Sequence, residues 1–151
     1  MLVAADVMTK DVVTVNKETS VRDLAKIFAE RRISSVPVVD GDGKLLGIVT
    51  ETDLIEQDKS LHIPTVVSIF DWVIYLESDK KFEQELNKMT GQTVGEIYST
   101  DVATIDPSTP LSKIADLLSS RKINAVPVVE NGTVVGMVAR IDLIRSMVGK
   151  G

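Results

Sequence analysis

The chain has 151 residues, of which 44% are apolar, enough for one compact domain or for two small units that share a core. It contains no cysteine, which excludes disulfides and thiolate metal sites, and its net charge of −5 argues against a nucleic-acid partner. The N-terminus lacks the basic start and apolar run of a signal peptide, and the apolar stretch at 61–76 is short for a bilayer span and is interrupted by Pro64 and Asp71. We therefore expect a cytoplasmic protein with no membrane span.

Residues 1–57 predict a βαββα unit. A β-branched run at 12–15 predicts a strand, and the next segment has apolar residues at helical spacing, namely Val21, Leu24, Ala25 and Phe28. A second strand is expected at 36–39, with its Pro37 at the strand's start or on a sheet edge. A Gly-Asp-Gly turn, a third strand at 45–49 and a helix that begins near residue 50 complete the unit.

Residues 58–91 form an insert. Its first part, 61–76, is apolar and aromatic, and its second part, 77–88, is charged and predicts a helix. Two interpretations stay open. The insert either covers the module's own helices or forms a surface for a dimer or another partner.

Residues 92–151 repeat the first unit. The segment around Pro37 reappears around Pro127, an offset of 90, and the segment around Asp53 reappears around Asp142, an offset of 89. Units of about 50 residues bury little surface alone. The duplication therefore predicts an α/β (α+β) fold in which two βαββα repeats pack sheet to sheet with pseudo-two-fold symmetry and share a core.

Local signals in the second repeat place its elements. Strands are expected at 102–105, 126–129 and 134–138. Thr109 is expected as the N-cap of a helix with Pro110 at its first position. The pair Asn131-Gly132 predicts a two-residue hairpin turn, and the final helix is expected to begin near Ala139.

The start of each final helix could bind a ligand. Thr50 and Asp53 have the spacing of a capping box, but a helix N-terminus with a hydroxyl and a carboxylate also suits a phosphate and the hydroxyls of a ribose. In the second repeat Ala139 replaces the threonine while Asp142 remains. A reciprocal cap does not explain Asp142, which favours a ligand role for both aspartates, although a favourable charge at a helix start stays open. Glycine before each site allows a close approach of backbone or ligand.

The motif Asp6-Val7-Met8-Thr9 and the segments 32–39 and 47–53 together resemble a CBS domain, named after cystathionine β-synthase. CBS domains occur in tandem pairs, and the resemblance covers the chain outside the insert. It implies two clefts between the repeats that bind AMP, ADP, ATP or S-adenosylmethionine, with AMP as the first expectation. Glu51 adds negative charge that would disfavour polyphosphates in the first cleft.

The resemblance also implies the residues of each cleft. The first cleft would use Thr50 and Asp53, with Thr100, Ala103, Ile123, Asn124 and Ala125 around the base. The second would use Asp142 and Arg140, with Thr9, Val13, Ile33, Ser34 and Ser35; here Ala139 departs from the family pattern. Taken singly, the apolar members could equally be core residues, and the two serines could be turn residues.

No catalytic constellation is present in the sequence. His62 is the one histidine, and neither a Gly-x-Ser-x-Gly elbow nor a phosphate-binding glycine loop with lysine occurs. We expect a regulatory module that is not an enzyme, requires no cofactor, and forms a homodimer through the helices at 21–28 and 143–147. Because the repeats and the insert account for the whole chain, the pair is expected to stand alone and to signal to an unknown effector protein. The alternatives are a protein-interaction module with empty clefts and an S-adenosylmethionine sensor.

Overall fold

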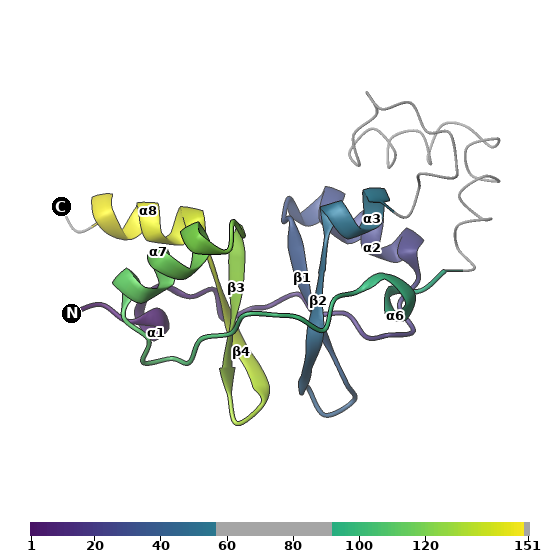
Figure 1. Ribbon diagram of the computed structural model, residues 1–151, viewed down its shortest axis with the longest axis horizontal. Coiled ribbons are helices and arrows are strands. Elements are labelled where there is room, and N and C mark those ends of the chain that lie inside the picture. Colours follow the sequence, from purple (N-terminus) through teal and green to yellow (C-terminus); the bar gives the residue numbers. More distant parts are fainter. Residues whose placement is uncertain (57–91, 150–151) are drawn as a thin grey trace.

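The computed structural model describes residues 1–56 and 92–149, so the predicted insert lies outside the described residues. Its elements in chain order are α1 Ala4–Val7, α2 Val21–Arg31, β1 Ser35–Val39, β2 Leu45–Thr50, α3 Glu51–Glu56, α6 Val94–Ile97, α7 Leu111–Ser120, β3 Ala125–Glu130, β4 Thr133–Ala139 and α8 Arg140–Val148. Strands β1 and β2 form one antiparallel hairpin, and β3 and β4 form another. The two hairpins lie at the centre, with α2, α3 and α6 beside β1 and β2 and with α1, α7 and α8 beside β3 and β4 (Figure 1). This arrangement confirms the predicted mixed fold class. None of the helices described is long and apolar enough to cross a membrane.

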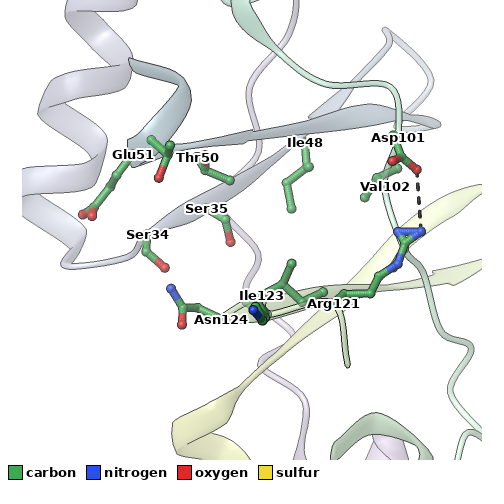
Figure 2. Close-up of a pocket in the computed structure, with 14 residues that line it drawn as sticks. Ser34, Ser35, Ile48, Thr50, Glu51, Asp101, Val102, Arg121, Ile123 and Asn124 are labelled. Atoms are coloured by element: carbon green, nitrogen blue, oxygen red, sulfur yellow. Dashed lines mark ion pairs between the residues drawn. The ribbon is translucent and has the colours of Figure 1, made fainter. Parts of the chain in front are cut away.

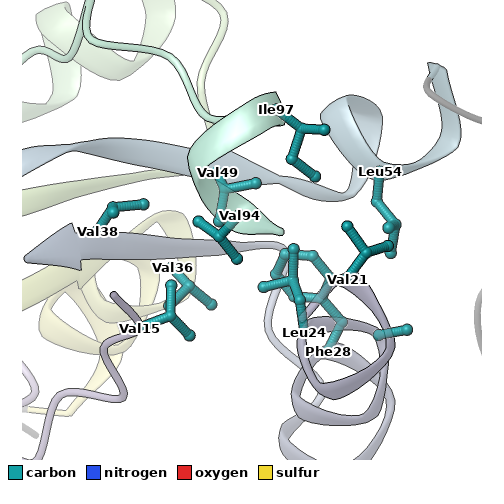
Figure 3. Packing of buried hydrophobic residues seen from close by; sticks show 11 residues of the cluster. Val15, Val21, Leu24, Phe28, Val36, Val38, Val49, Leu54, Val94 and Ile97 are labelled. Carbon is teal, nitrogen blue, oxygen red and sulfur yellow. The ribbon is translucent and has the colours of Figure 1, made fainter. Parts of the chain in front are cut away.

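The apolar face of α2 packs on β1 and β2. Val21, Leu24, Ala25 and Phe28 are all fully buried in one cluster, as their helical spacing predicts (Figure 3). Ser20 caps the helix by accepting a hydrogen bond of 3.0 Å from the Asp23 N–H. This face is therefore used inside the chain, and the predicted homodimer contact of the helix stays a prediction that would have to use its other faces.

Helix α7 begins one residue later than predicted. Pro110 occupies the N-cap position and Leu111 is the first helical residue, so the prediction of Thr109 as the cap is wrong. The hydroxyl of Thr109 instead accepts a hydrogen bond of 3.1 Å from the N–H of Asp106 in the preceding turn. This local bond competes with helix capping, as is typical of threonine.

The first strand of each repeat is reduced to one residue. Val15 bridges to β1 in parallel: its N–H donates to the Pro37 carbonyl at 3.1 Å, and its carbonyl accepts from the Val39 N–H at 2.9 Å. Extending this ladder to Val13 would require an N–H at residue 37, which proline lacks. Pro37 lies in the middle of β1, not at its start. Its missing N–H is on the side of β1 that pairs with Val15, so the parallel pairing ends there. The second repeat has the same arrangement at Ile105.

The hairpin turns follow the sequence signals. Asn131 and Gly132 have φ values of 54° and 81°, as a two-residue turn with left-handed residues requires. The two hairpin tips are joined, because the Leu45 N–H donates to the Gly132 carbonyl at 2.9 Å. The repeats are thus connected at one end of the hairpins.

The two repeats exchange their first helices. The N–H of Ala4 in α1 donates to Thr109 of the second repeat at 2.9 Å, and the N–H of Val94 in α6 donates to Thr19 of the first repeat at 2.8 Å (Figure 1). The buried residues described form two clusters, one on each hairpin, where one shared core was expected. Each cluster is completed by a helix from the other repeat, so the exchange replaces the shared core.

Two glycines receive the exchanged segments. A Cβ atom on Gly47 would overlap the carbonyl oxygen of Ser99 and the ring of Tyr98, and one on Gly136 would overlap the side chain of Met8. The sequence left open whether backbone or a ligand approaches these glycines. In the structure, a segment of the chain itself packs against each of them.

Candidate functional site

The start of α3 is a reciprocal cap. The carboxylate oxygen Oδ2 of Asp53 accepts from the Thr50 N–H at 2.8 Å and from the Thr50 hydroxyl at 3.1 Å, and the Asp53 N–H donates back to that hydroxyl at 3.2 Å. The capping interpretation of the Thr-x-x-Asp spacing therefore accounts for this geometry. The other carboxylate oxygen of Asp53 has no hydrogen-bond partner in the described part of the chain.

The start of α8 keeps half of this arrangement. Oδ2 of Asp142 accepts from the Ala139 N–H at 2.7 Å. Asp142 thus caps the helix without a partner hydroxyl, so the prediction that capping does not explain this aspartate is wrong. The feature of Asp142 that favours a ligand role is its position on the wall of the second cavity, described below.

The first cavity has a volume of about 280 Å³ and lies between the start of α3 and residues 101–103 and 121–125 of the second repeat (Figure 2). Of the residues predicted for the first cleft, those that line it are Thr50, Ala103, Ile123, Asn124 and Ala125. Thr100 and Asp53 are not among its lining residues. This volume is at the lower limit for a small-molecule site.

The second cavity is larger, about 590 Å³, which is within the range of small-molecule sites. It lies between the start of α8 and the residues that precede β1. Every residue predicted for the second cleft lines it, namely Thr9, Val13, Ile33, Ser34, Ser35, Arg140 and Asp142. The departure at Ala139 does not close this cavity, and Ala139 itself contributes to its wall.

The two cavities meet at the seam between the repeats. Ser34, Ser35, Glu51, Asn124 and Ala125 line both of them. The hydroxyl oxygen of Ser35 is buried and has no hydrogen-bond partner in residues 1–56 and 92–149. A buried hydroxyl without a partner needs an explanation, and a ligand or an ordered water at the seam would provide one.

Sequence reasoning missed three arginines of the second cavity. Arg31, Arg32 and Arg145 line it together with the predicted Arg140. Two signals were available: the arginine pair directly precedes the predicted residue Ile33, and Arg145 lies about one helical turn after Asp142.

The family model described as "CBS domain" matches the chain twice, at residues 3–60 and 94–149. Protein MJ1426 of Methanocaldococcus jannaschii is 26% identical over 156 residues, which cover 98% of this chain and 92% of that protein. Two other curated relatives are much longer, and the chain spans only 23% and 14% of their lengths.

Two solved structures have a similar fold over nearly the whole chain. The CBS domain pair of protein MJ0100, in complex with 5′-methylthioadenosine and S-adenosyl-L-methionine, has a TM-score of 0.71 and 27% identity, and the match covers 100% of this chain and 99% of that one. CBSX2 of Arabidopsis thaliana, in complex with AMP, has a TM-score of 0.75 and 24% identity, with 99% and 98% covered.

Proposed function

This chain belongs to the CBS domain family, and we propose that it is a regulatory module that binds an adenine-containing ligand at the seam between its two repeats. AMP is the first ligand to test, followed by ADP and ATP, with S-adenosylmethionine as the alternative. The proposal assigns the repeats to residues 1–57 and 92–151.

The second cavity is the observation that carries this proposal. It has room for a nucleoside, and its wall comes from both repeats. A ligand seated there contacts both repeats at once, so its binding free energy depends on their relative orientation. A likeness to the MJ0100 pair, which binds two adenosine-containing compounds, supports the same ligand class.

The wall of the second cavity offers contacts suited to a nucleoside. Val13, Ile33 and Met137 provide apolar surface for a base, and Ser34 adds a hydroxyl. Asp142 uses Oδ2 as a cap, and Oδ1 has no hydrogen-bond partner in the described ranges, so it can accept from the hydroxyls of a ribose. Asp142 is therefore our proposed ribose contact.

The proposed mechanism is a change in the relative orientation of the repeats. The hairpin tips are held together by the Leu45–Gly132 hydrogen bond, while the cavities lie at the opposite, helical ends of the hairpins. A ligand that favours one opening of the helical ends shifts the population toward it, with coupling free energies of about 1–3 kcal/mol in typical allosteric proteins. In this proposal the chain is not an enzyme, and an effector protein reads the orientation.

Isothermal titration calorimetry tests the proposal. The protein is unfolded and refolded to remove copurified ligand, and then titrated with AMP, ADP, ATP, S-adenosylmethionine and 5′-methylthioadenosine. We expect saturable binding of at least one compound. Val13→Trp fills the second cavity and should abolish this binding. Ser112→Trp, on the exposed face of α7, should leave the binding unchanged.

The competing hypothesis is an interaction module with empty clefts that recruits a partner through residues 61–76, which lie outside the described residues. It predicts that deleting the insert abolishes self-association or partner binding, and that cavity variants have no effect. The same calorimetry separates the two hypotheses, because an interaction module binds none of the five compounds.

A further inference from the structure

Two acidic positions in the last helix of the first repeat are arginines in the second. At the offset of 89, Glu51 corresponds to Arg140 and Glu56 corresponds to Arg145. The backbones at the first of these positions are equivalent, because Glu51 and Arg140 each donate their N–H to a residue at the seam, at 3.0 Å in both repeats. The pseudo-symmetric frame therefore carries opposite charges on the helices that face the two cavities.

The two cavities differ in charge as a result. Four arginines and three carboxylates line the second cavity, and one of these carboxylates, Asp142, is engaged in capping α8. Two cations and two carboxylates line the first, where Arg121 pairs with Asp101 at 3.7 Å (Figure 2). In the part of the chain that the structure describes, the equivalent Arg31 has no ion-pair partner. The charges that line the first cavity therefore balance, whereas those that line the second leave an excess of one positive charge.

Arg140 is oriented toward the seam. Its Nε–H donates to the carbonyl of Ile123 at 3.1 Å, while its two terminal nitrogens have no hydrogen-bond partner among the described residues. A guanidinium fixed at one N–H and free at its fork suits two parallel hydrogen bonds to a phosphate. Arg145 lines the same cavity about one helical turn further along α8.

We propose that the two cavities are sorted by charge: the second binds a phosphorylated adenosine through Arg140 and Arg145, and the first does not bind the phosphate. This inference rests on the proposed function and names the ligand class of its main cavity. The charge sorting predicts that each chain binds one nucleotide, even though the chain contains two repeats.

The test compares AMP with adenosine, which lacks the phosphate, by isothermal titration calorimetry. We expect one AMP per chain, bound at least tenfold more tightly than adenosine. Arg140→Gln/Arg145→Gln should weaken AMP binding about tenfold or more, because charge-assisted hydrogen bonds are lost, and should change adenosine binding less than twofold. Lys113→Gln removes one positive charge on the exposed face of α7 and controls for general electrostatics, so it should leave AMP binding within twofold of the wild type.

A matched pair assigns the cavity. Arg31→Gln, at the second cavity, should weaken AMP binding, whereas Arg121→Gln, the equivalent change at the first cavity, should leave it within twofold of the wild type. Three results would each overturn the charge sorting: two equal AMP sites per chain, equal affinities for AMP and adenosine, or equal losses of AMP affinity in Arg31→Gln and Arg121→Gln. The proposed function would still stand in each case, provided that adenosine binds. If none of AMP, ADP, ATP, adenosine, 5′-methylthioadenosine and S-adenosylmethionine binds the wild type, the proposed function fails and the charge sorting fails with it.

Discussion

Ile48 and Ser99 exchange two backbone hydrogen bonds, each of 2.9 Å, and so join a central strand of the first repeat to a segment that belongs to the second. Thr9 and Met137 form the equivalent pair at 2.9 and 3.0 Å. These bonds hold the segments that follow α6 and α1 against the hairpins. The relative position of the repeats, and with it the seam, depends on how closely these segments approach.

Gly47→Ala and Gly136→Ala should each destabilise the protein. The added methyl group overlaps the crossing segment, and overpacking of this kind typically costs about 1–3 kcal/mol in the free energy of unfolding. Urea denaturation measures the change. Gly41→Ala is the control, because no atom lies within 4 Å of its added Cβ. Equal midpoints for the Gly41 and Gly47 variants would show that the approach is not tight.

Asp53→Ala and Asp142→Ala should separate stability from binding. Both remove a hydrogen bond at a helix start, and the loss of a cap typically costs about 0.5–2 kcal/mol in unfolding free energy. Of these two aspartates, Asp142 lines the second cavity and Asp53 lines neither the first nor the second, so only the Asp142 variant should also weaken adenosine binding, by about fivefold or more if ribose contacts are lost. The ligand role predicted for Asp53 stays a prediction, and a comparable loss of binding in its variant would support it over capping alone.

Ser108 should control the titration of Asp106. Hydrogen bonds from the side chain and backbone of Ser108 lower the pKa of the Asp106 carboxyl below its ordinary value, and the hydroxyl bond is 2.6 Å long. Since the folded pKa lies below the unfolded one, the stabilisation is complete above the unfolded pKa and is lost as the pH falls through the folded value. In NMR titrations, Ser108→Ala should raise the Asp106 pKa. An unchanged pKa would contradict this assignment.

Helix α8 exposes apolar side chains that suit the predicted homodimer. Ile144 and Met147 expose 54% and 82% of their surface, and Ile55, at the position equivalent to Ile144, exposes 54%. Ile144→Lys/Met147→Lys should convert a dimer to a monomer in sedimentation velocity, because charges would replace buried apolar contacts. A wild type that sediments as a monomer would exclude α8 as the dimer surface. A wild-type dimer whose Ile144→Lys/Met147→Lys variant also sediments as a dimer would exclude it as well.

The sequence was most informative where local chemistry decides the structure. Asn131-Gly132 specified its turn, and the spacing of Val21 to Phe28 specified a buried helix face. The exchange of α1 and α6 was not predictable, because helices of four residues have too little periodicity to reveal where they pack. The shortening of the first strand was predictable in principle from the missing N–H of Pro37.

The site was predicted less completely than the fold. Thr-x-x-Asp spacing is the same for a cap and for a ligand site, so the orientation of Asp53 required coordinates. The second cavity gathers all its predicted residues, yet its charge was missed. Arg31 and Arg145 are far apart in the sequence and come together only when the repeats pack.

A crystal structure of the chain grown with AMP tests the central claim most directly. The account predicts electron density for one nucleotide in the second cavity, with the base beside Val13 and Ile33 and the phosphate on Arg140. A seam that stays free of nucleotide at saturating AMP, or a nucleotide bound away from it, would contradict the account.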